Sequence, residues 1–112
     1  MAKKLIESDI LFEVKDPLGR KIRTSKSYWE KIIKIKNPEL KFGIDESKQA
    51  LVNPDEIRRS VTDSTVVLYV RKVNDYDILI VTVKLLNGDG FIITVYQTQV
   101  YKAKGELVWQ RT

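Results

Sequence analysis

The segment Val66–Thr98 reads VVLYVRKV, NDYD, ILIVTVKLL, NGDG and FIITVYQT in succession. Three runs rich in β-branched residues are separated by two groups of turn-forming residues, which predicts three antiparallel strands in a meander. In the NGDG turn we place Gly90 at the left-handed position of a three-residue hairpin loop, so that Asn87 pairs with Phe91. The NDYD turn is expected to be a loop of even length.

This pairing sorts the strand side chains onto two faces, because successive residues of a strand point to opposite sides. One face is wholly apolar and is predicted to be the core: Val66, Leu68, Val70, Leu79, Val81, Val83, Leu85, Phe91, Ile93 and Val95. The other, the mixed face, combines apolar side chains with hydroxyls and cations: Val67, Tyr69, Arg71, Ile78, Ile80, Thr82, Lys84, Ile92, Thr94 and Tyr96. Lys84 is expected opposite Thr94, and Thr82 opposite Tyr96. A register slip of one residue in either hairpin would move the side chains of a strand to the opposite face.

Composition limits the chemistry that the chain can perform. Its 112 residues suit a single domain, 1–112. It has no cysteine and no histidine, which excludes disulfides, thiolate sites and histidine acid–base catalysis. No apolar run reaches about eighteen residues, and the N-terminal sequence MAKKLIESDILFEV is too acidic for a secretory signal, so we expect a cytoplasmic protein.

Positive charge is concentrated in one part of the chain. The net charge is +5, and the segment Lys15–Lys41 contains nine cations against three anions. A localised basic region favours a polyanionic partner such as RNA. The alternative is a solvated, lysine-rich helix face without a partner.

The residues before the meander predict a small hairpin and then helices. Leu11–Lys15 and Lys21–Arg23 are expected to pair across a Pro-Gly turn. A helix capped by Ser25 or Ser27 should bury Trp29 and end before Pro38.

Two shorter helices should follow, Glu46–Val52 capped by Asp45, and Pro54 to about Arg59. Glu106–Gln110 is expected to be a final strand. The predicted fold class is therefore α+β, with the N-terminal helices packed on one face of a roughly four-stranded antiparallel sheet.

The mixed face is the candidate site because its residue types suit phosphate. Arg58 and Arg59 are expected at the edge of the sheet, close to the cations and hydroxyls of the mixed face. Arginine and lysine bind phosphate, and tyrosine can stack on a base or donate to a phosphate oxygen. Such groups could stabilise the charge that develops on phosphate during RNA cleavage. The alternative is an ordinary solvated sheet face.

Five sequence blocks occur in an order that resembles a known family. They are the Trp29 helix ending near NPEL (37–40), NPDEIRRS (53–60), VVLYVRKV (66–73), VTVKLLNGDGFIITVY (81–96) and GELVW (105–109). This order is similar to that of the small phage-associated members of the barnase–EndoU–colicin–RelE nuclease superfamily. The resemblance implies N-terminal helices, then a four-stranded antiparallel sheet whose open face cuts RNA without a metal. One departure is Asn37, where these relatives usually have the histidine of His-Pro-Glu-Leu.

The resemblance predicts a metal-independent, toxin-like, RNA-directed endoribonuclease that uses no cofactor. The expected catalytic residues are Lys84, Arg59, Tyr96, Tyr69 and Thr94. The expected RNA-binding residues are Arg58, Arg71, Ser60, Asn37 and Lys34. The expected partners are RNA and an antitoxin or immunity protein. The alternatives are a catalytically inactive RNA- or protein-binding module on the same fold, and a mixed face that serves as a dimer or partner interface.

Overall fold

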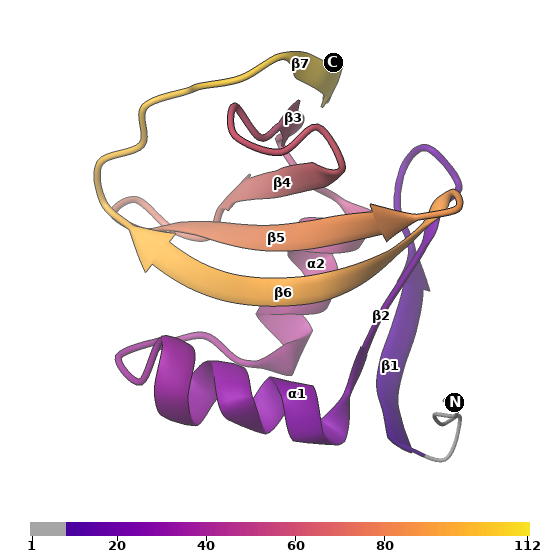
Figure 1. Ribbon diagram of the computed structural model, residues 1–112. Coiled ribbons are helices and arrows are strands. Elements are labelled where there is room, and N and C mark those ends of the chain that lie inside the picture. Colours follow the sequence, from indigo (N-terminus) through magenta and orange to yellow (C-terminus); the bar gives the residue numbers. More distant parts are fainter. Residues whose placement is uncertain (1–8) are drawn as a thin grey trace.

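A single mixed sheet accounts for most of the molecule in the computed structural model, which describes residues 9–112 (Figure 1). Residues 1–8 lie outside the described residues. They include the start of the N-terminal sequence for which we expected no secretory signal. The strands of the described part are β1 (Ile10–Lys15), β2 (Lys21–Ser25), β3 (Glu56–Arg59), β4 (Val66–Lys72), β5 (Ile78–Leu86), β6 (Asp89–Thr98) and β7 (Leu107–Gln110). They lie in the order β1-β2-β6-β5-β4-β3-β7, and every neighbouring pair is antiparallel except β2 and β6.

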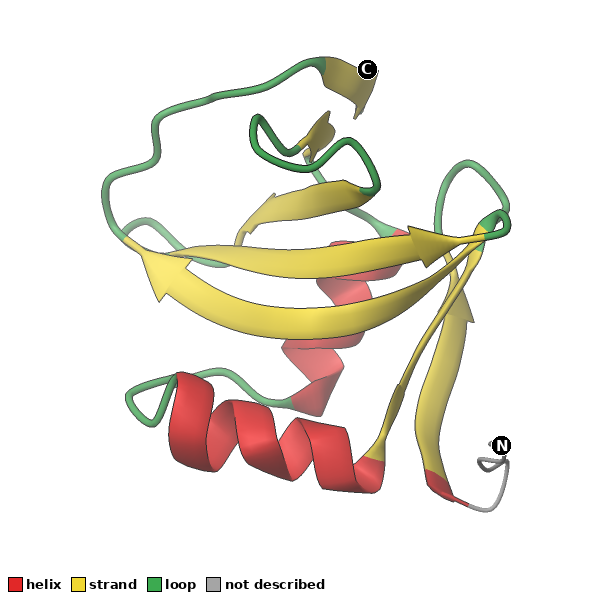
Figure 2. Cartoon of the chain, viewed as in Figure 1, coloured by secondary structure: helices red, strands yellow, loops and turns green. Residues whose placement is uncertain are grey.

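Two short helical segments connect β2 to β3 (Figure 2). The first is α1 (Lys26–Lys31), which continues as the π-helical turn η2 (Ile32–Lys36). Ser25 caps it as predicted, because its hydroxyl accepts a hydrogen bond from the Tyr28 backbone N–H at 3.1 Å. The second is α2 (Ile44–Val52), which begins two residues earlier than expected. Within residues 9–112, no helix is long and apolar enough to cross a membrane.

The predicted fold class is wrong. Residues 9–112 form seven strands in one mixed sheet with only two short helices, instead of helices packed on a four-stranded antiparallel sheet. The N-terminal hairpin is confirmed, but it extends the sheet because β2 pairs in parallel with Gly90 and Phe91 of β6. Glycine is needed there, since a Cβ on Gly90 would lie 2.6 Å from side-chain carbons of Ile22 and Val83.

The predicted helix Pro54–Arg59 is also wrong. Residues Glu56–Arg59 form β3, which lies between β4 and β7. Ile57 is fully buried while its neighbours are half-buried, which is the alternation of a strand. Long-range pairing with β4 on one side and β7 on the other satisfies this backbone, so pairing outweighs the local helix-start signal of Asn53-Pro54.

Helix α2 lies behind the sheet in Figure 1, and the core fills the space between them. Trp29, expected to be a core anchor, is buried at 7% exposure. The buried core residues are Phe12, Ile22, Trp29, Ile32, Ala50, Leu51, Ile57, Val67, Tyr69, Leu79, Val81, Val83, Ile92 and Val95. We call the opposite side of strands β3 to β6 the open face.

The predicted face of β4 is wrong by one residue. The loop after β4 contains five residues, 73–77, so its length is odd and Tyr69 pairs with Val81. The Asn74 side chain holds this loop by accepting from the backbone N–H groups of Tyr76 and Asp77, each at 2.8 Å. As a result, three residues expected on the mixed face point toward the helices (Val67, Tyr69 and Arg71), and three expected in the core lie on the open face (Val66, Leu68 and Val70).

The second hairpin differs from the expected pairing but keeps most of the expected face. Asn87 and Gly88, with φ of 53° and 88°, form a two-residue turn, so Lys84 pairs with Phe91 and not with Thr94. A bulge then leaves Ile93 as an extra residue, and beyond it Thr82 pairs with Thr94. These two departures compensate. The β5 residues that were predicted for the mixed face, and Thr94 and Tyr96 of β6, therefore lie on the open face as expected. Near the turn, Phe91 and Ile92 exchange faces.

Candidate functional site

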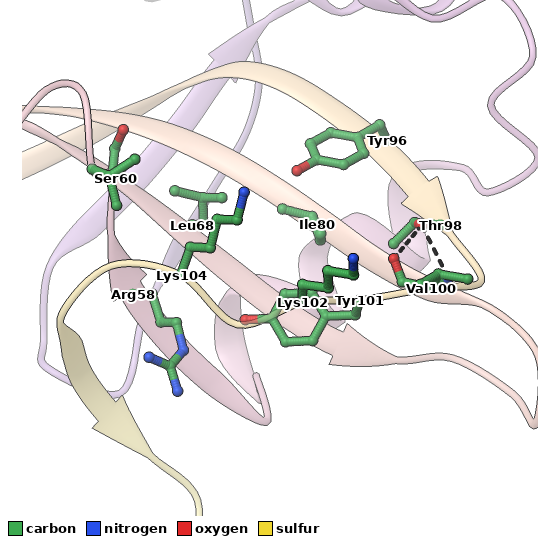
Figure 3. A pocket seen from close by; sticks show the side chains of 11 residues that line it. Arg58, Ser60, Leu68, Ile80, Tyr96, Thr98, Val100, Tyr101, Lys102 and Lys104 are labelled. Carbon is green, nitrogen blue, oxygen red and sulfur yellow. Dashed lines mark hydrogen bonds between the residues drawn. The ribbon is translucent and has the colours of Figure 1, made fainter.

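A groove of about 270 Å³ lies on the open face. Its floor consists of Leu68, Ile80, Tyr96 and Thr98, from β4, β5 and β6. The strap, residues 99–106 between β6 and β7, forms one wall and contributes Val100, Tyr101, Lys102 and Lys104 (Figure 3). Arg58, Ser60 and Val61 close one end.

A polar cluster fastens the middle of the strap to the sheet. The Tyr101 hydroxyl donates a hydrogen bond to Glu56 Oε2, and Arg58 Nε donates to the same oxygen at 2.7 Å. Arg58 Nη1 also donates to the Gly105 carbonyl at 2.9 Å. Gly105 is closely packed, since a Cβ there would lie 1.9 Å from the Arg59 carbonyl oxygen. These contacts hold the strap, so the groove wall is a defined part of the fold.

The polar cluster keeps its groups in definite protonation states. Partial burial alone would raise the pKa of Glu56, but the hydrogen bonds from Arg58 and Tyr101 outweigh it and lower that pKa. Burial, together with the bond to Glu56, raises the pKa of Tyr101 to about 12. At neutral pH the cluster is therefore a carboxylate, a guanidinium and a protonated phenol.

Lys102 and Lys104 supply the uncompensated positive charge of the groove. Neither has a carboxylate of the described residues within ion-pair distance, although eight other cations do. Figure 3 shows both side chains extending from the strap over the sheet, with Lys104 next to Leu68. The Tyr96 ring lies on the opposite side of the groove floor, and burial raises the pKa of its phenol. The groove thus presents two ammonium groups and a protonated phenol over an apolar floor.

Lys84 lies on the open face beyond the groove, next to the loop between β3 and β4. Its Nζ is 3.2 Å from Asp63 Oδ2. Hydrogen bonds from the side chain and backbone of Thr65, and then the contact with Lys84, lower the pKa of Asp63 to about 2. Lys84 therefore faces a carboxylate that is ionised at neutral pH.

Thr94 and Asn37 are joined at the edge of β6. The Asn37 amide donates to Thr94 Oγ1 at 3.1 Å and to the Val95 carbonyl at 2.9 Å. Asn37, which follows η2, therefore satisfies an outer-edge carbonyl of β6 and fixes the Thr94 hydroxyl. Thr94 pairs with Thr82, and this pair is two residues along the strands from the pair of Ile80 and Tyr96 on the groove floor.

Tyr69 lies on the other side of the sheet from the open face, which corrects its expected position on the mixed face. It is fully buried, and its hydroxyl donates to Asp16 Oδ2 at 2.5 Å and accepts from Arg20 Nη2 at 3.3 Å. Burial, followed by the bond to Asp16, raises its pKa. Tyr69 therefore ties the β1–β2 turn to the core, out of reach of a ligand on the open face.

Three further expected residues also lie outside the groove lining and have partners of their own. Arg71 donates to the Asn53 carbonyl at 2.6 Å beside α2. Arg59 pairs with Glu106 at 3.1 Å and donates to the Ser64 carbonyl at 3.1 Å. Lys34 is on α1–η2 and lies 3.8 Å from Glu30, four residues away.

The expected site set is thus divided. Ser60, Arg58 and Tyr96 line the groove, and Lys84 and Thr94 share the same face. The groove residues Tyr101, Lys102 and Lys104 are not among the residues predicted from the sequence, because they lie between the predicted meander and the predicted final strand. The available signal was the local composition, in which one aromatic residue and two lysines stand within four positions before Gly105.

No protein-family model matches this chain, and no curated protein and no solved structure matches it either. Within residues 9–112, no group of three acidic side chains is placed to hold a metal ion. The function proposed next therefore rests on the groove and the open face.

Proposed function

We propose that this chain binds single-stranded RNA in the groove of the open face. The observation that carries the proposal is the position of Lys102 and Lys104, which have no carboxylate partner among the described residues and line the same groove as Tyr96 and Tyr101. Proteins that bind single strands combine a cationic path for the backbone with aromatic side chains on which bases stack. Single-stranded RNA has the charged backbone and the exposed bases that such a site binds.

The remaining groups of the groove are also suited to this ligand. Leu68 and Ile80 give the floor an apolar surface for the faces of bases. The raised pKa of Tyr96 keeps its hydroxyl protonated at neutral pH, so it can act as a hydrogen-bond donor, whereas the Tyr101 hydroxyl already donates to Glu56 and leaves only its ring for a ligand. Donors and cations favour an anionic ligand, and the net charge of +5 aids its approach.

A second candidate function is metal-independent cleavage of the bound RNA, as the resemblance to the nuclease superfamily implies. It is favoured by the presence of Lys84, Thr94 and Tyr96 on one face, beside the groove. A lysine ammonium and a protonated phenol could stabilise the negative charge that develops on the phosphate. RNA binding is the first candidate because Lys84 lies outside the groove lining and its Nζ is paired with Asp63 Oδ2 at 3.2 Å. The toxin-like role, cytoplasmic location and antitoxin or immunity partner belong to this second candidate.

The test is a fluorescence anisotropy titration of labelled single-stranded RNA in EDTA at several salt concentrations. The variant Lys102→Gln/Lys104→Gln should bind more weakly, and its logarithmic salt slope should decrease by about 0.7 for each phosphate contact that is lost. The control Lys15→Gln/Lys48→Gln has the same net charge but changes residues outside the groove, and it should bind like the wild type. Equal weakening by both pairs would show that only total charge matters and would refute the groove as the site.

Cleavage is examined in the same samples on a denaturing gel. Shortened RNA in the presence of EDTA, reduced by Lys84→Ala, would establish the second candidate. If the bound RNA remains intact, both as naked RNA and on ribosomes, the cleavage candidate is refuted and RNA binding without catalysis remains.

A further inference from the structure

Helix α1 and η2 cover the outer edge of β6 (Figure 1). Strand β2 pairs with β6 only at Gly90 and Phe91, so the carbonyls further along need other partners. The Ile93 carbonyl accepts from the Tyr28 hydroxyl at 3.1 Å and from Lys36 Nζ at 2.8 Å. This side of the helix is therefore fixed against the edge of the sheet, where it adjoins the open face.

An aromatic pair lies at this junction. The ring centroids of Tyr28 and Phe91 are 5.8 Å apart, and the rings are tilted by 43°. Phe91 pairs with Lys84, so its side chain is on the same face of the sheet as Lys84. Both aromatic residues are half-buried, which leaves part of each accessible at the surface. The pair thus extends the open face as far as α1.

Two ammonium groups lie close to the same ring. Lys31 Nζ is 5.6 Å from the Tyr28 centroid, and Lys36 Nζ is 5.0 Å from it and donates to the Tyr28 hydroxyl at 2.7 Å. Both lysines are exposed, and neither is within ion-pair distance of a carboxylate in the described part of the chain, whereas Lys34 pairs with Glu30. The bonds to the Ile93 carbonyl and the Tyr28 hydroxyl hold Lys36 in place and leave one of its three N–H donors for a ligand. No side-chain hydrogen bond of Lys31 is present among residues 9–112, and the ring attracts its charge only modestly at an exposed site.

We propose that Tyr28, Lys31, Lys36 and Phe91 form a second subsite for the same RNA strand, which we call the β6-edge subsite. This inference rests on the proposed RNA binding and extends it. Phe91 is five residues from Tyr96 along β6, a distance of roughly 16 Å at the rise of a β-strand. The RNA would run from the strap across the sheet to α1, with a base stacked at the aromatic pair and its phosphates beside the lysines.

Affinity measured with two RNA lengths tests this path. We compare a labelled dinucleotide, which fills the groove alone, with an octanucleotide, which reaches both subsites. Lys31→Gln should weaken octanucleotide binding and decrease its salt slope by about 0.7, while dinucleotide binding is unchanged. Lys34→Gln is the matched control, because it removes the same charge from the same helix but from the lysine that pairs with Glu30.

Phe91→Leu provides an independent measure, since it keeps an apolar side chain but removes the stacking surface. It should weaken octanucleotide binding by about fivefold or more. Circular dichroism and thermal unfolding establish that the variant is folded, and its dinucleotide affinity shows whether the groove is intact.

The outcomes separate this inference from the proposed function. In one outcome, Lys102→Gln/Lys104→Gln weakens octanucleotide binding, whereas Lys31→Gln and Lys34→Gln bind the octanucleotide as tightly as the wild type does. The groove then binds RNA, and the β6-edge subsite is refuted. If the wild-type chain shows no salt-dependent binding of either RNA, both proposals fail.

Discussion

Tyr69 offers the sharpest test of the structure, because its position decides between a site residue and a core residue. In Tyr69→Phe the hydroxyl that donates to Asp16 Oδ2 at 2.5 Å is lost. The Asp16 side chain is inaccessible to solvent, and a hydrogen bond to a charged group contributes about 1.5–3 kcal/mol. Asp16 keeps its other donors, which are the backbone N–H groups of Leu18 and Arg20 and the Arg20 side chain.

Because the carboxylate is not left without partners, we expect a destabilisation near the lower part of that range, about 2 kcal/mol. For a chain of this size this corresponds to a decrease in Tm of roughly 8 °C. Urea unfolding followed by tryptophan fluorescence measures the free energy of unfolding, since Trp29 is buried in the core and Trp109 packs against it.

The matched control is Tyr96→Phe, which removes the same hydroxyl from the open face. No protein hydrogen bond of the Tyr96 hydroxyl is present among residues 9–112, so its loss should change stability by less than about 0.5 kcal/mol. Its loss should instead weaken RNA binding, whereas Tyr69→Phe should bind RNA like the wild type at a temperature where it is folded. A Tyr69→Phe variant of unchanged stability that no longer bound RNA would refute the face assigned to β4.

Three further predictions follow from other contacts. Gly105→Ala should destabilise the fold by at least about 2 kcal/mol in thermal unfolding, because φ is +84° and the new Cβ would lie 1.9 Å from the Arg59 carbonyl oxygen; wild-type stability would contradict this packing. Asn37→Ala should lower the free energy of urea unfolding by about 1–2 kcal/mol, since a buried-edge carbonyl of β6 loses its donor, and an unchanged urea midpoint would count against that bond. Asp63 has a folded-state pKa lowered to about 2, below its unfolded value, so the stability that it contributes is present above pH 3.8 and is lost as pH falls toward 2. The difference in urea midpoint between wild type and Asp63→Asn should therefore vanish in that range, and a difference that stays constant with pH would refute the contacts of Asp63 with Thr65 and Lys84.

Several elements were predictable because their signals are local. The side chain of Ser25 caps α1, and Asn37-Pro38 ends the helical segment, as residue type alone indicated. The three strands of the 66–98 meander lie close to the expected ranges, since β-branched runs between turn residues depend little on the rest of the fold. The first hairpin was predictable for the same reason.

The candidate site was only partly predictable, because a face depends on counting across loops. One residue more or less in the loop at 73–77 decides whether Tyr69 or Leu68 faces the ligand, and the sequence NDYD is compatible with both. The strap was not predictable as a groove wall, since Tyr101 is placed by a bond to Glu56, which is 45 residues away in the chain.

The sequence by itself determined which chemistry is excluded, where the strands of the meander lie, and that positive charge is concentrated before residue 42. The tertiary structure alone decided that β2 joins β6 at Gly90, that 56–59 forms a strand, and that the strap encloses a groove. The physical reason is the range of the interactions. Propensity and capping act within a few residues, whereas strand pairing, the parity of loops and the closing of a groove depend on contacts between segments far apart in the chain.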